Sequence, residues 1–192
     1  MYTYDQTALV VIDMQYDFVS QYGSLYVSGA EKIVPRVNRE ILKAVYKGME
    51  VAYTKDWHPS VTPHFREYGG KWPSHCIART GGANFHPDLI VAGPTFYKGH
   101  GKEDGYSGFR SYNEEERQVT ETGLETYLYE KHVDEIVVCG VATEYCVKET
   151  VLDALSHCFG VNVLLDAVRA VDQQTGAEAL VEMEQKGARM RG

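Results

Sequence analysis

Five short apolar runs are spaced along the chain, each with the length of a β-strand. They are ALVVID at 8–13, EVAYTKD at 50–56, PTFYKG at 94–99, EIVVCGV at 135–141 and NVLLDAV at 162–168. Continuous apolar runs of this length are typical of strands buried on both faces, the arrangement found in parallel sheets. The pattern therefore predicts five strands in a parallel sheet.

Between these runs, apolar residues recur at the three- and four-residue spacing of a helix buried along one face. The sets are Ile33, Val37, Ile41 and Val45; Leu124, Leu128 and Val133; Val147, Val151, Ala154 and Leu155; and Ala179, Leu180 and Met183. Because strands and helices alternate, the pattern predicts an α/β fold, a doubly wound and mostly parallel sheet with helices on both faces and right-handed crossovers. The closing GARMRG is expected to form only a short edge strand.

The composition is that of an ordinary globular domain, and it argues against nucleic acid and membranes as partners. The 192 residues are 44% hydrophobic and 24% charged, which predicts a single domain over 1–192 whose core needs no disulfides. A net charge of -8 and the lack of a Lys/Arg cluster argue against nucleic acid as a partner. No apolar run has the length of a membrane span or the flanks of a secretion signal, so a soluble cytoplasmic protein with no membrane partner is expected.

The four cysteines form no CxxC pair and no dense pattern. Free thiols in a reducing compartment are therefore expected, rather than a disulfide framework. Cys139 and Cys158 are expected to be small, buried core residues. Neither charge nor length decides whether the chain is a monomer or a homo-oligomer.

Residues 57–93 show neither the strand nor the helix period, and they are rich in Pro, Gly, His and aromatic residues. A loop of this length inside a compact domain is usually functional. A disordered insert is a poor explanation, because disordered segments contain few aromatic residues. A functional loop is therefore expected within 56–93.

Reactive side chains stand at the ends of four predicted strands. Asp13, Asp56 and Lys98 close the first three, and the fourth leads through GVATEYC to Cys146. Ligands of open α/β sheets bind beside the carboxyl ends of the strands, so these four side chains are expected at one edge. Taken alone, each has an ordinary alternative: Asp13 could be a helix cap or turn residue, and Lys98 a solvated strand end.

Cys146 carries the most chemical information of the four. If Thr143 caps the next helix, Cys146 stands at its third position, where free backbone N–H groups and the helix dipole stabilise a thiolate. Asp13 could accept the thiol proton and Lys98 could hold the charges together, forming a Cys, Asp, Lys catalytic set. The backbone amides of Ala142 and Cys146 could serve as an oxyanion hole.

The segment DWHPSVTPHF contains a carboxylate and two imidazoles. Pro59 and Pro63 prevent a regular helix between His58 and His64, so these histidines cannot form the pair of a helical zinc motif. Any metal site here must be made by a shaped loop.

Asp56 and His58 stand two positions apart at a strand end, which points both side chains to the same side. His75 is a third imidazole, after His64, in the same loop. One carboxylate and three imidazoles suit Zn, Fe or Mn better than Ca or Mg. The alternative is that one or more of the histidines only hydrogen-bonds the loop together. Cys76 is left out as a ligand, because consecutive residues rarely point at one ion.

Four sets of residues follow one another along the chain in an order found in a known family. They are VVIDMQYDF; DWHPSVTPHF with GGKWPSHCIARTGGANFHP; FYKGHGKEDGYSGF; and GVATEYCV. They resemble, in turn, the first strand, the metal loop, the lysine segment and the nucleophile turn of the nicotinamidase/pyrazinamidase branch of the isochorismatase-like cysteine hydrolases. The resemblance covers almost the whole chain and implies the isochorismatase-like, Rossmann-like strand order.

The resemblance carries a role to each matching position of this chain. The implied catalytic residues are Asp13, Lys98 and Cys146; the metal ligands Asp56, His58, His64 and His75; and the substrate-binding aromatics Phe18, Trp72 and Tyr106. A cis peptide between Val141 and Ala142 is also implied. Tyr16, Glu144 and Tyr145 depart from the usual family residues, which bears on substrate preference and not on the chemistry.

The implied activity is the metal-dependent hydrolysis of nicotinamide, and of pyrazinamide-type analogues, to the acid and ammonia through a Cys146 thioester. This is a step of NAD salvage. One divalent metal ion is implied, with zinc first and iron or manganese as alternatives, and its role is to position the substrate ring.

Three other functions stay open on the sequence. One is another cysteine amidase of the superfamily, acting on a carbamoyl or ureido group; such amidases generally lack the Asp and His metal set. Another is a zinc hydrolase that needs no cysteine. The last is a non-catalytic metal-binding module, which would have no physical need for a carboxylate, an ammonium and a thiol at three strand ends.

Overall fold

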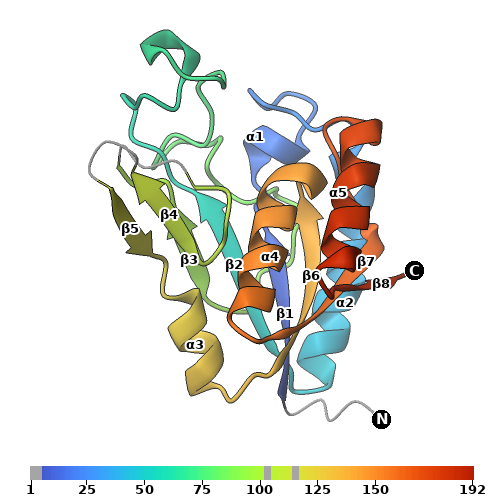
Figure 1. Cartoon of the computed structure of the whole chain (residues 1–192). Helices are drawn as coiled ribbons and strands as arrows, with labels where there is room; N and C mark the ends of the chain where they lie inside the picture. The colour runs from blue at the N-terminus through green and yellow to red at the C-terminus, as the bar shows by residue number, and fades with distance from the viewer. Residues whose placement is uncertain (1–5, 102–104, 114–116) are drawn as a thin grey trace.

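A parallel sheet of six strands forms the centre of the computed structural model (Figure 1). The strands are β1 (Thr7–Ile12), β2 (Glu50–Asp56), β3 (Thr95–Lys98), β6 (Glu135–Val141), β7 (Gly160–Arg169) and β8 (Arg189–Arg191). Their order is β3-β2-β1-β6-β7-β8, and each neighbouring pair is parallel. The predicted strands and the Rossmann-like order are confirmed, and β8 is the short edge strand expected at GARMRG.

The structure describes residues 6–101, 105–113 and 117–192. The predicted domain 1–192 extends beyond these ranges. The motif FYKGHGKEDGYSGF likewise includes 102–104, which lie outside the described residues.

Helices cover both faces of the sheet, as the alternating pattern predicts (Figure 1). The longer ones are α2 (Val34–Tyr46), α3 (Leu124–Glu130), α4 (Lys148–Ser156) and α5 (Gln173–Gln185). Helix α2 packs on one face, whereas α3, α4 and α5 pack on the other. Short helical segments are α1 (Tyr16–Val19), η2 (Ala30–Ile33), η3 (Arg66–Tyr68) and the π-helix η4 (Thr143–Val147).

Strand β1 divides the core into two halves, because successive side chains of a strand point to opposite faces. Leu9 and Val11 belong to the hydrophobic cluster that includes α2. Ala8, Val10 and Ile12 belong to the cluster that includes α3, α4 and α5. Burial of both faces explains why the strands read as continuous apolar runs.

The structure differs from the sequence pattern in two places. It contains an antiparallel hairpin of β4 (Arg110–Asn113) and β5 (Gln118–Glu121) that the pattern does not predict, because β5 is exposed along its length and has no apolar run. Cys158, expected in the core, is exposed at the turn after α4 in a left-handed conformation with φ 66°, while Cys139 is buried as expected.

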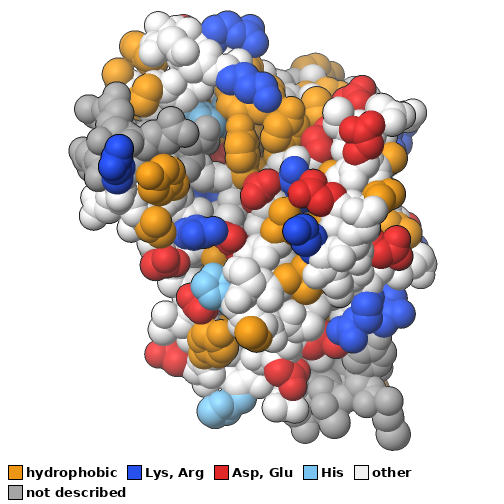
Figure 2. All heavy atoms as spheres, viewed as in Figure 1, with side chains coloured by type: hydrophobic (Ala, Val, Ile, Leu, Met, Phe, Trp, Pro, Cys, Tyr) orange, Lys and Arg blue, Asp and Glu red, His pale blue; other side chains and the backbone are white. Residues whose placement is uncertain are grey.

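None of the helices among the described residues combines the length and the apolar character needed to cross a membrane. The face shown in Figure 2 carries acidic and basic side chains interspersed with one another.

The sheet has a switch point between β1 and β6. From β1 the chain proceeds outward through β2 to β3, and from β6 it proceeds in the other direction through β7 to β8. The loops that follow β1 and β6 therefore separate at the carboxyl edge of the sheet, which is where open α/β sheets hold their ligands.

Candidate active site and metal centre

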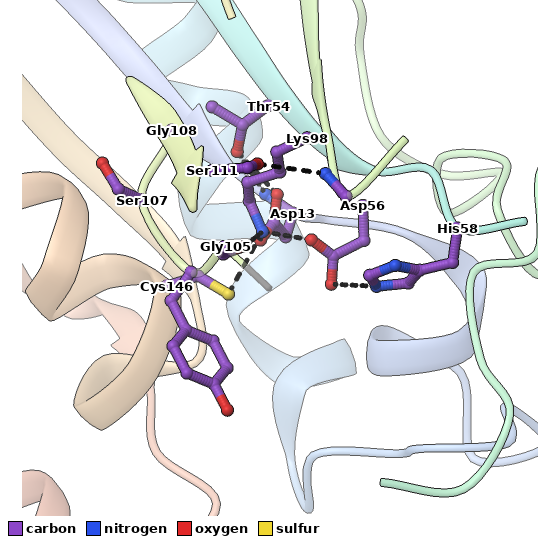
Figure 3. A network of polar contacts seen from close by, with 12 residues as sticks. Asp13, Thr54, Asp56, His58, Lys98, Gly105, Ser107, Gly108, Ser111 and Cys146 are labelled. Carbon is purple, nitrogen blue, oxygen red and sulfur yellow. Dashed lines mark hydrogen bonds and ion pairs between the residues drawn. The ribbon is translucent and has the colours of Figure 1, made fainter. Parts of the chain in front are cut away.

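The four strand-end side chains meet at this carboxyl edge, as predicted. The Nζ of Lys98 lies 2.8 Å from Oδ2 of Asp13, donates a hydrogen bond to Asp56 and lies 3.4 Å from Sγ of Cys146 (Figure 3). One oxygen each of Asp13 and Asp56 and the Cys146 sulfur all lie within 4.8 Å of one another. All four residues are buried, so the cluster is shielded from bulk water.

The residue just after β1, Asp13, is held by its neighbour in β2. The Thr54 hydroxyl donates to Oδ1 of Asp13 at 2.6 Å, and the Asp13 backbone N–H donates to the same hydroxyl oxygen at 3.2 Å. Asp13 has a positive φ of 48°, an uncommon conformation for a residue with a side chain. Asp13 is therefore a fixed, buried carboxylate at a turn and not a helix cap, since Gln15 is the N-cap of α1.

Cys146 lies in a π-helix rather than in the first turn of a capped α-helix. The N-cap of η4 is Ala142 and no side chain caps it, so the predicted Thr143 cap is wrong. Instead, the Val147 N–H donates to the Ala142 carbonyl at 3.1 Å, the five-residue spacing of a π-turn. Such turns are frequent at functional sites, and a local capping pattern cannot predict them.

The charges in the cluster set the resting protonation states. Burial lowers the pKa of Lys98, but Asp13 and Asp56 more than reverse this and raise it well above its ordinary value. Burial raises the pKa of Asp13, and Lys98 opposes part of that effect. Burial and the two carboxylates also raise the pKa of the Cys146 thiol. Lys98 lowers it, but by less, so the pKa of the thiol stays well above its ordinary value. The site thus holds a charged lysine, a neutral thiol and an unusually basic carboxylate.

This result corrects the expectation of a thiolate stabilised by a helix end. Cys146 is buried beside two carboxylates, and both disfavour an additional negative charge. A reaction in which Cys146 is the nucleophile would therefore need a base to remove the thiol proton.

The peptide bond between Val141 and Ala142 is cis, as the family resemblance implies. Ala142 and Cys146, whose backbone amides are the predicted oxyanion hole, both line the pocket beside the cluster.

The three predicted histidine ligands also come together. One ring nitrogen each of His58, His64 and His75 lies within 4.8 Å of the others. Oδ2 of Asp56 lies 3.6 Å from Nε2 of His58 and 3.7 Å from Nε2 of His75. The structure thus brings all four predicted ligands to one place, with the second oxygen of Asp56 turned to Lys98.

The protonation and hydrogen bonding of these residues fit a metal ion. Both ring nitrogens of His58 are buried and lack a hydrogen-bond partner among the described residues, and burial lowers the pKa of this imidazole. Nδ1 of His75 lies 2.8 Å from the Pro73 carbonyl, which leaves Nε2 as the free lone pair facing Asp56. Against the effect of burial, the Lys98 ammonium holds the pKa of Asp56 well below its usual range. Three imidazole rings with an ionised carboxylate form a donor set for a divalent metal.

Gly99, directly after Lys98, makes room for this cluster. It has a φ of 71°, and a Cβ at this position would come 2.5 Å from Cε1 of His58. A side chain at position 99 would therefore collide with the His58 ring, so the position requires glycine.

The substrate-binding residues predicted from the resemblance line one pocket. Its walls include Phe18, Trp72 and Tyr106, together with Asp56, His64, His75, Ala142 and Cys146. The Trp72 Nε1–H donates to the Tyr106 hydroxyl at 2.9 Å, which joins the metal loop to the segment after β3. The pocket therefore lies between the cysteine and the histidines.

Five further residues line the pocket that the sequence did not single out as wall residues: Leu25, Val27, Gly105, Tyr145 and Val171. The ring of Tyr145 lies edge-on to that of Trp72 at 5.1 Å and tilted to that of Tyr106 at 5.5 Å. Leu25, Val27 and Val171 belong to no local motif and lie far along the chain from Cys146 or from the metal loop, so only the fold shows that they line the pocket. Glu144, in contrast, accepts hydrogen bonds from the Val171 and Asp172 N–H groups and does not line the pocket.

Comparisons with known proteins agree with this geometry. The isochorismatase domain model matches residues 7–191. The nicotinamidase/pyrazinamidase of Mycobacterium tuberculosis is 36% identical over 181 residues, covering 92% of this chain and 93% of that protein.

Two solved structures share the fold. The zinc complex of the pyrazinamidase of Pyrococcus horikoshii has a TM-score of 0.88 and 40% identity, covering 97% of this chain and 98% of that one. The nicotinate complex of PnC1 from L. infantum has a TM-score of 0.90 and 31% identity, covering 100% of this chain and 94% of that one. The chain therefore belongs to the isochorismatase family, and within it to the nicotinamidase/pyrazinamidase branch.

Proposed function

We propose that this protein is a nicotinamidase, which hydrolyses nicotinamide to nicotinate and ammonia and also accepts pyrazinamide-type analogues. The observation that carries the proposal is that the cysteine cluster and the three-histidine cluster share Asp56 and open into one pocket. A relative that is a nicotinamidase/pyrazinamidase and a similar structure that holds nicotinate support the substrate class.

Asp13 acts as the general base and Cys146 as the nucleophile. The carboxylate and the sulfur lie within 4.8 Å, and the raised pKa of Asp13 makes it a better acceptor for the thiol proton. As the proton moves from sulfur to carboxylate, negative charge moves toward the sulfur. Lys98 lies 3.4 Å from that sulfur and 2.8 Å from Asp13, so it stabilises the charge on either group.

The sulfur then attacks the carboxamide carbon and forms a carbon–sulfur bond. The backbone amides of Ala142 and Cys146 stabilise the oxyanion of the tetrahedral intermediate. Asp13 returns the proton to the leaving nitrogen, and ammonia departs from a Cys146 thioester. Asp13 next deprotonates a water, which hydrolyses the thioester to the carboxylic acid and restores the thiol.

Asp56, His58, His64 and His75 hold one divalent metal ion, and zinc is proposed first, with iron and manganese as alternatives. When bound, the ion supplies a ligand position for the ring nitrogen of the substrate, directly or through water, and so orients the ring. A similar pyrazinamidase in complex with zinc supports this choice.

Phe18, Trp72 and Tyr106 hold the aromatic ring between them, because aromatic side chains contact a planar ring over a large area. A planar ring between the histidines and the cysteine presents its carboxamide to the sulfur. We further propose that one domain spans 1–192 and that the protein works in the cytoplasm.

The direct test is ammonia release from nicotinamide by the purified protein, before and after chelation and with single metals added back. We expect release that stops on chelation and returns with zinc, iron or manganese. The same assay on carbamoyl and ureido compounds tests the related amidase chemistry. No ammonia from nicotinamide with any of the three metals would contradict the proposal.

A further inference from the structure

Two side chains of the segment after β1 hold the metal loop by its backbone, and the sequence assigns neither of them to the site. Gln15 and Asp17 follow the predicted base Asp13 by two and four positions. Gln15 is completely buried, and neither residue lines the substrate pocket. A role for them must therefore act through the residues that they contact.

Gln15 binds both backbone groups of the metal ligand Asp56. Its Nε2 donates to the Asp56 carbonyl at 2.8 Å, and its Oε1 accepts from the Asp56 N–H at 2.8 Å. The same Nε2 also donates to the Ala83 carbonyl at 3.0 Å. One carboxamide thus ties the first residue of the loop to a residue near its end.

Asp17 holds the other side of the metal cluster. Its Oδ2 accepts from the Cys76 N–H at 2.7 Å, and its Oδ1 accepts from the Ser24 N–H at 3.2 Å. Cys76 follows the ligand His75, and its carbonyl accepts from the His58 N–H at 3.1 Å. Asp17 therefore fixes the backbone that pairs the His58 part of the loop with the His75 part.

We propose that Gln15 and Asp17 are positioning residues for the metal centre, which set the spacing of the Asp56 and His58 side relative to the His75 side. The inference rests on the proposed metal site. The loop between Asp56 and Ala83 has little regular structure, so its ligands would lose much conformational entropy on binding if nothing held them beforehand. Groups that orient metal ligands typically contribute about 10- to 100-fold to metal affinity.

The carboxamide of Gln15 can be tested by a change that keeps its shape. In Gln15→Glu, a carboxylate of similar size would face the Asp56 and Ala83 carbonyl oxygens with no hydrogen to donate. Gln15→Leu removes all three hydrogen bonds without adding a charge. Asp17→Asn is the conservative change, because one oxygen remains to accept a hydrogen bond while the other becomes a donor.

The experiment measures the Kd of Zn²⁺ for the metal-free proteins by competition with a chromophoric chelator. We expect Gln15→Glu and Gln15→Leu to weaken zinc binding by about 10- to 100-fold, and Asp17→Asn by a smaller factor. Co²⁺ is a second probe, because its visible absorption reports ligand geometry. We expect the two Gln15 variants to change that spectrum, which a loss of general stability would not do.

Asn162→Leu is the matched control. Asn162 is also buried, but it donates to Glu135 and accepts from Arg191, away from the loop. This variant should lower the free energy of unfolding and leave the zinc Kd unchanged.

Zinc Kd values within about threefold of wild type in both Gln15 variants would overturn the inference, as would an equal weakening in Asn162→Leu. If Gln15→Glu does not fold, Gln15→Leu and Asp17→Asn decide the question. If the wild-type protein binds no zinc, iron or manganese, the proposed metal site fails and the inference fails with it. If the wild type and the variants all bind zinc equally tightly, the positioning role of Gln15 and Asp17 fails while the proposed metal site stands.

Discussion

At the scale of single residues, Lys98 links the two halves of the site. Its ammonium contacts Asp13, Asp56 and Cys146, so one buried cation neutralises the proposed base and also a proposed metal ligand. A buried charge is tolerable only when it is paired, which explains why this lysine is 1% exposed and yet charged. The arrangement makes the charge balance of the nucleophile site depend on Asp56.

Replacing the proposed nucleophile should separate catalysis from metal binding. We expect Cys146→Ala to lower kcat for nicotinamide by at least about 10³-fold, because no other group can form the thioester. The zinc content should stay unchanged, since Cys146 is not one of the four proposed metal ligands. Ammonia release and metal analysis of the same sample measure the two effects.

Cys158→Ala is the control for that change, because Cys158 is an exposed thiol. It should retain wild-type activity. Substantial turnover by Cys146→Ala would favour direct attack by a metal-activated water and would rule out the thioester.

Removal of the Lys98 ammonium should affect stability as well as turnover. Lys98→Met leaves two buried carboxylates without their cation, so we expect a loss of about 3–5 kcal/mol in the free energy of unfolding of the metal-free protein. Urea unfolding measures this loss. Lys148→Met is the comparison, since its ion pairs with Glu149 and Glu182 lie at the surface and should contribute at most about 1 kcal/mol. Equal losses in the two variants would contradict the assigned role of the buried pair.

At the scale of elements, the carboxyl edge of the sheet supplies the reactive groups and the loops supply the walls. Strands β2 and β3 end at Asp56 and Lys98, and Asp13 directly follows the neighbouring strand β1. The parallel pairing of rigid strands thus sets the spacing of the reactive side chains. The metal loop and the segment after β3 then close around them through the Trp72 to Tyr106 hydrogen bond.

The Trp72 to Tyr106 hydrogen bond should matter for substrate binding more than for chemistry. Tyr106→Phe keeps the ring and removes the acceptor for the Trp72 N–H. A net hydrogen bond contributes about 1 kcal/mol, so KM for nicotinamide should rise by roughly fivefold with kcat nearly unchanged. Tyr112→Phe, at an exposed position of β4, should change neither value. An unchanged KM in Tyr106→Phe would show that the hydrogen bond does not hold the pocket.

The helices that cover the sheet should differ in sensitivity according to the face that a residue occupies. Leu128 in α3 is completely buried, whereas Leu42 in α2 is 55% exposed. We expect Leu128→Ala to lower the free energy of unfolding by about 2–5 kcal/mol through the cavity that it leaves. Leu42→Ala should change it by no more than about 0.5 kcal/mol. Denaturant titration of both metal-free variants measures the difference, and similar values would contradict the burial of Leu128 between α3 and the sheet.

At the scale of the whole molecule, metal binding and folding should be coupled. The four proposed ligands come from β2 and from a loop with little regular structure, so they are assembled only in the folded chain. Zinc at 100 times its Kd should therefore add about 2.7 kcal/mol to the free energy of unfolding.

Thermal unfolding with and without zinc measures this coupling. The Tm should rise with zinc concentration for the wild type and should not respond in His64→Ala, which removes one imidazole of the cluster. A zinc response in His64→Ala at the same zinc concentrations as in the wild type would mean that His64 is not a ligand.

The sequence by itself determined the fold class and the main candidate site residues. Strands buried on both faces must be apolar throughout, and helices buried along one face must be apolar at helical spacing. Both patterns can therefore be recognised within a short stretch of sequence. The loop prolines likewise excluded a helical zinc motif from local sterics alone. Asp13, Lys98 and Cys146 could be grouped because parallel strands bring their carboxyl ends to one edge.

Only the tertiary structure decided how these residues bear on one another. Three contacts join segments far apart in the chain. They are the ion pair of Lys98 with Asp56, the hydrogen bond of Gln15 to the Asp56 backbone and the position of Tyr145 in the pocket wall. The neutral Cys146 thiol follows from burial beside two carboxylates, and its π-helical turn follows from packing that no capping motif predicts. Distances, burial and charge pairing depend on the packed chain as a whole, whereas local patterns record only which face each residue prefers.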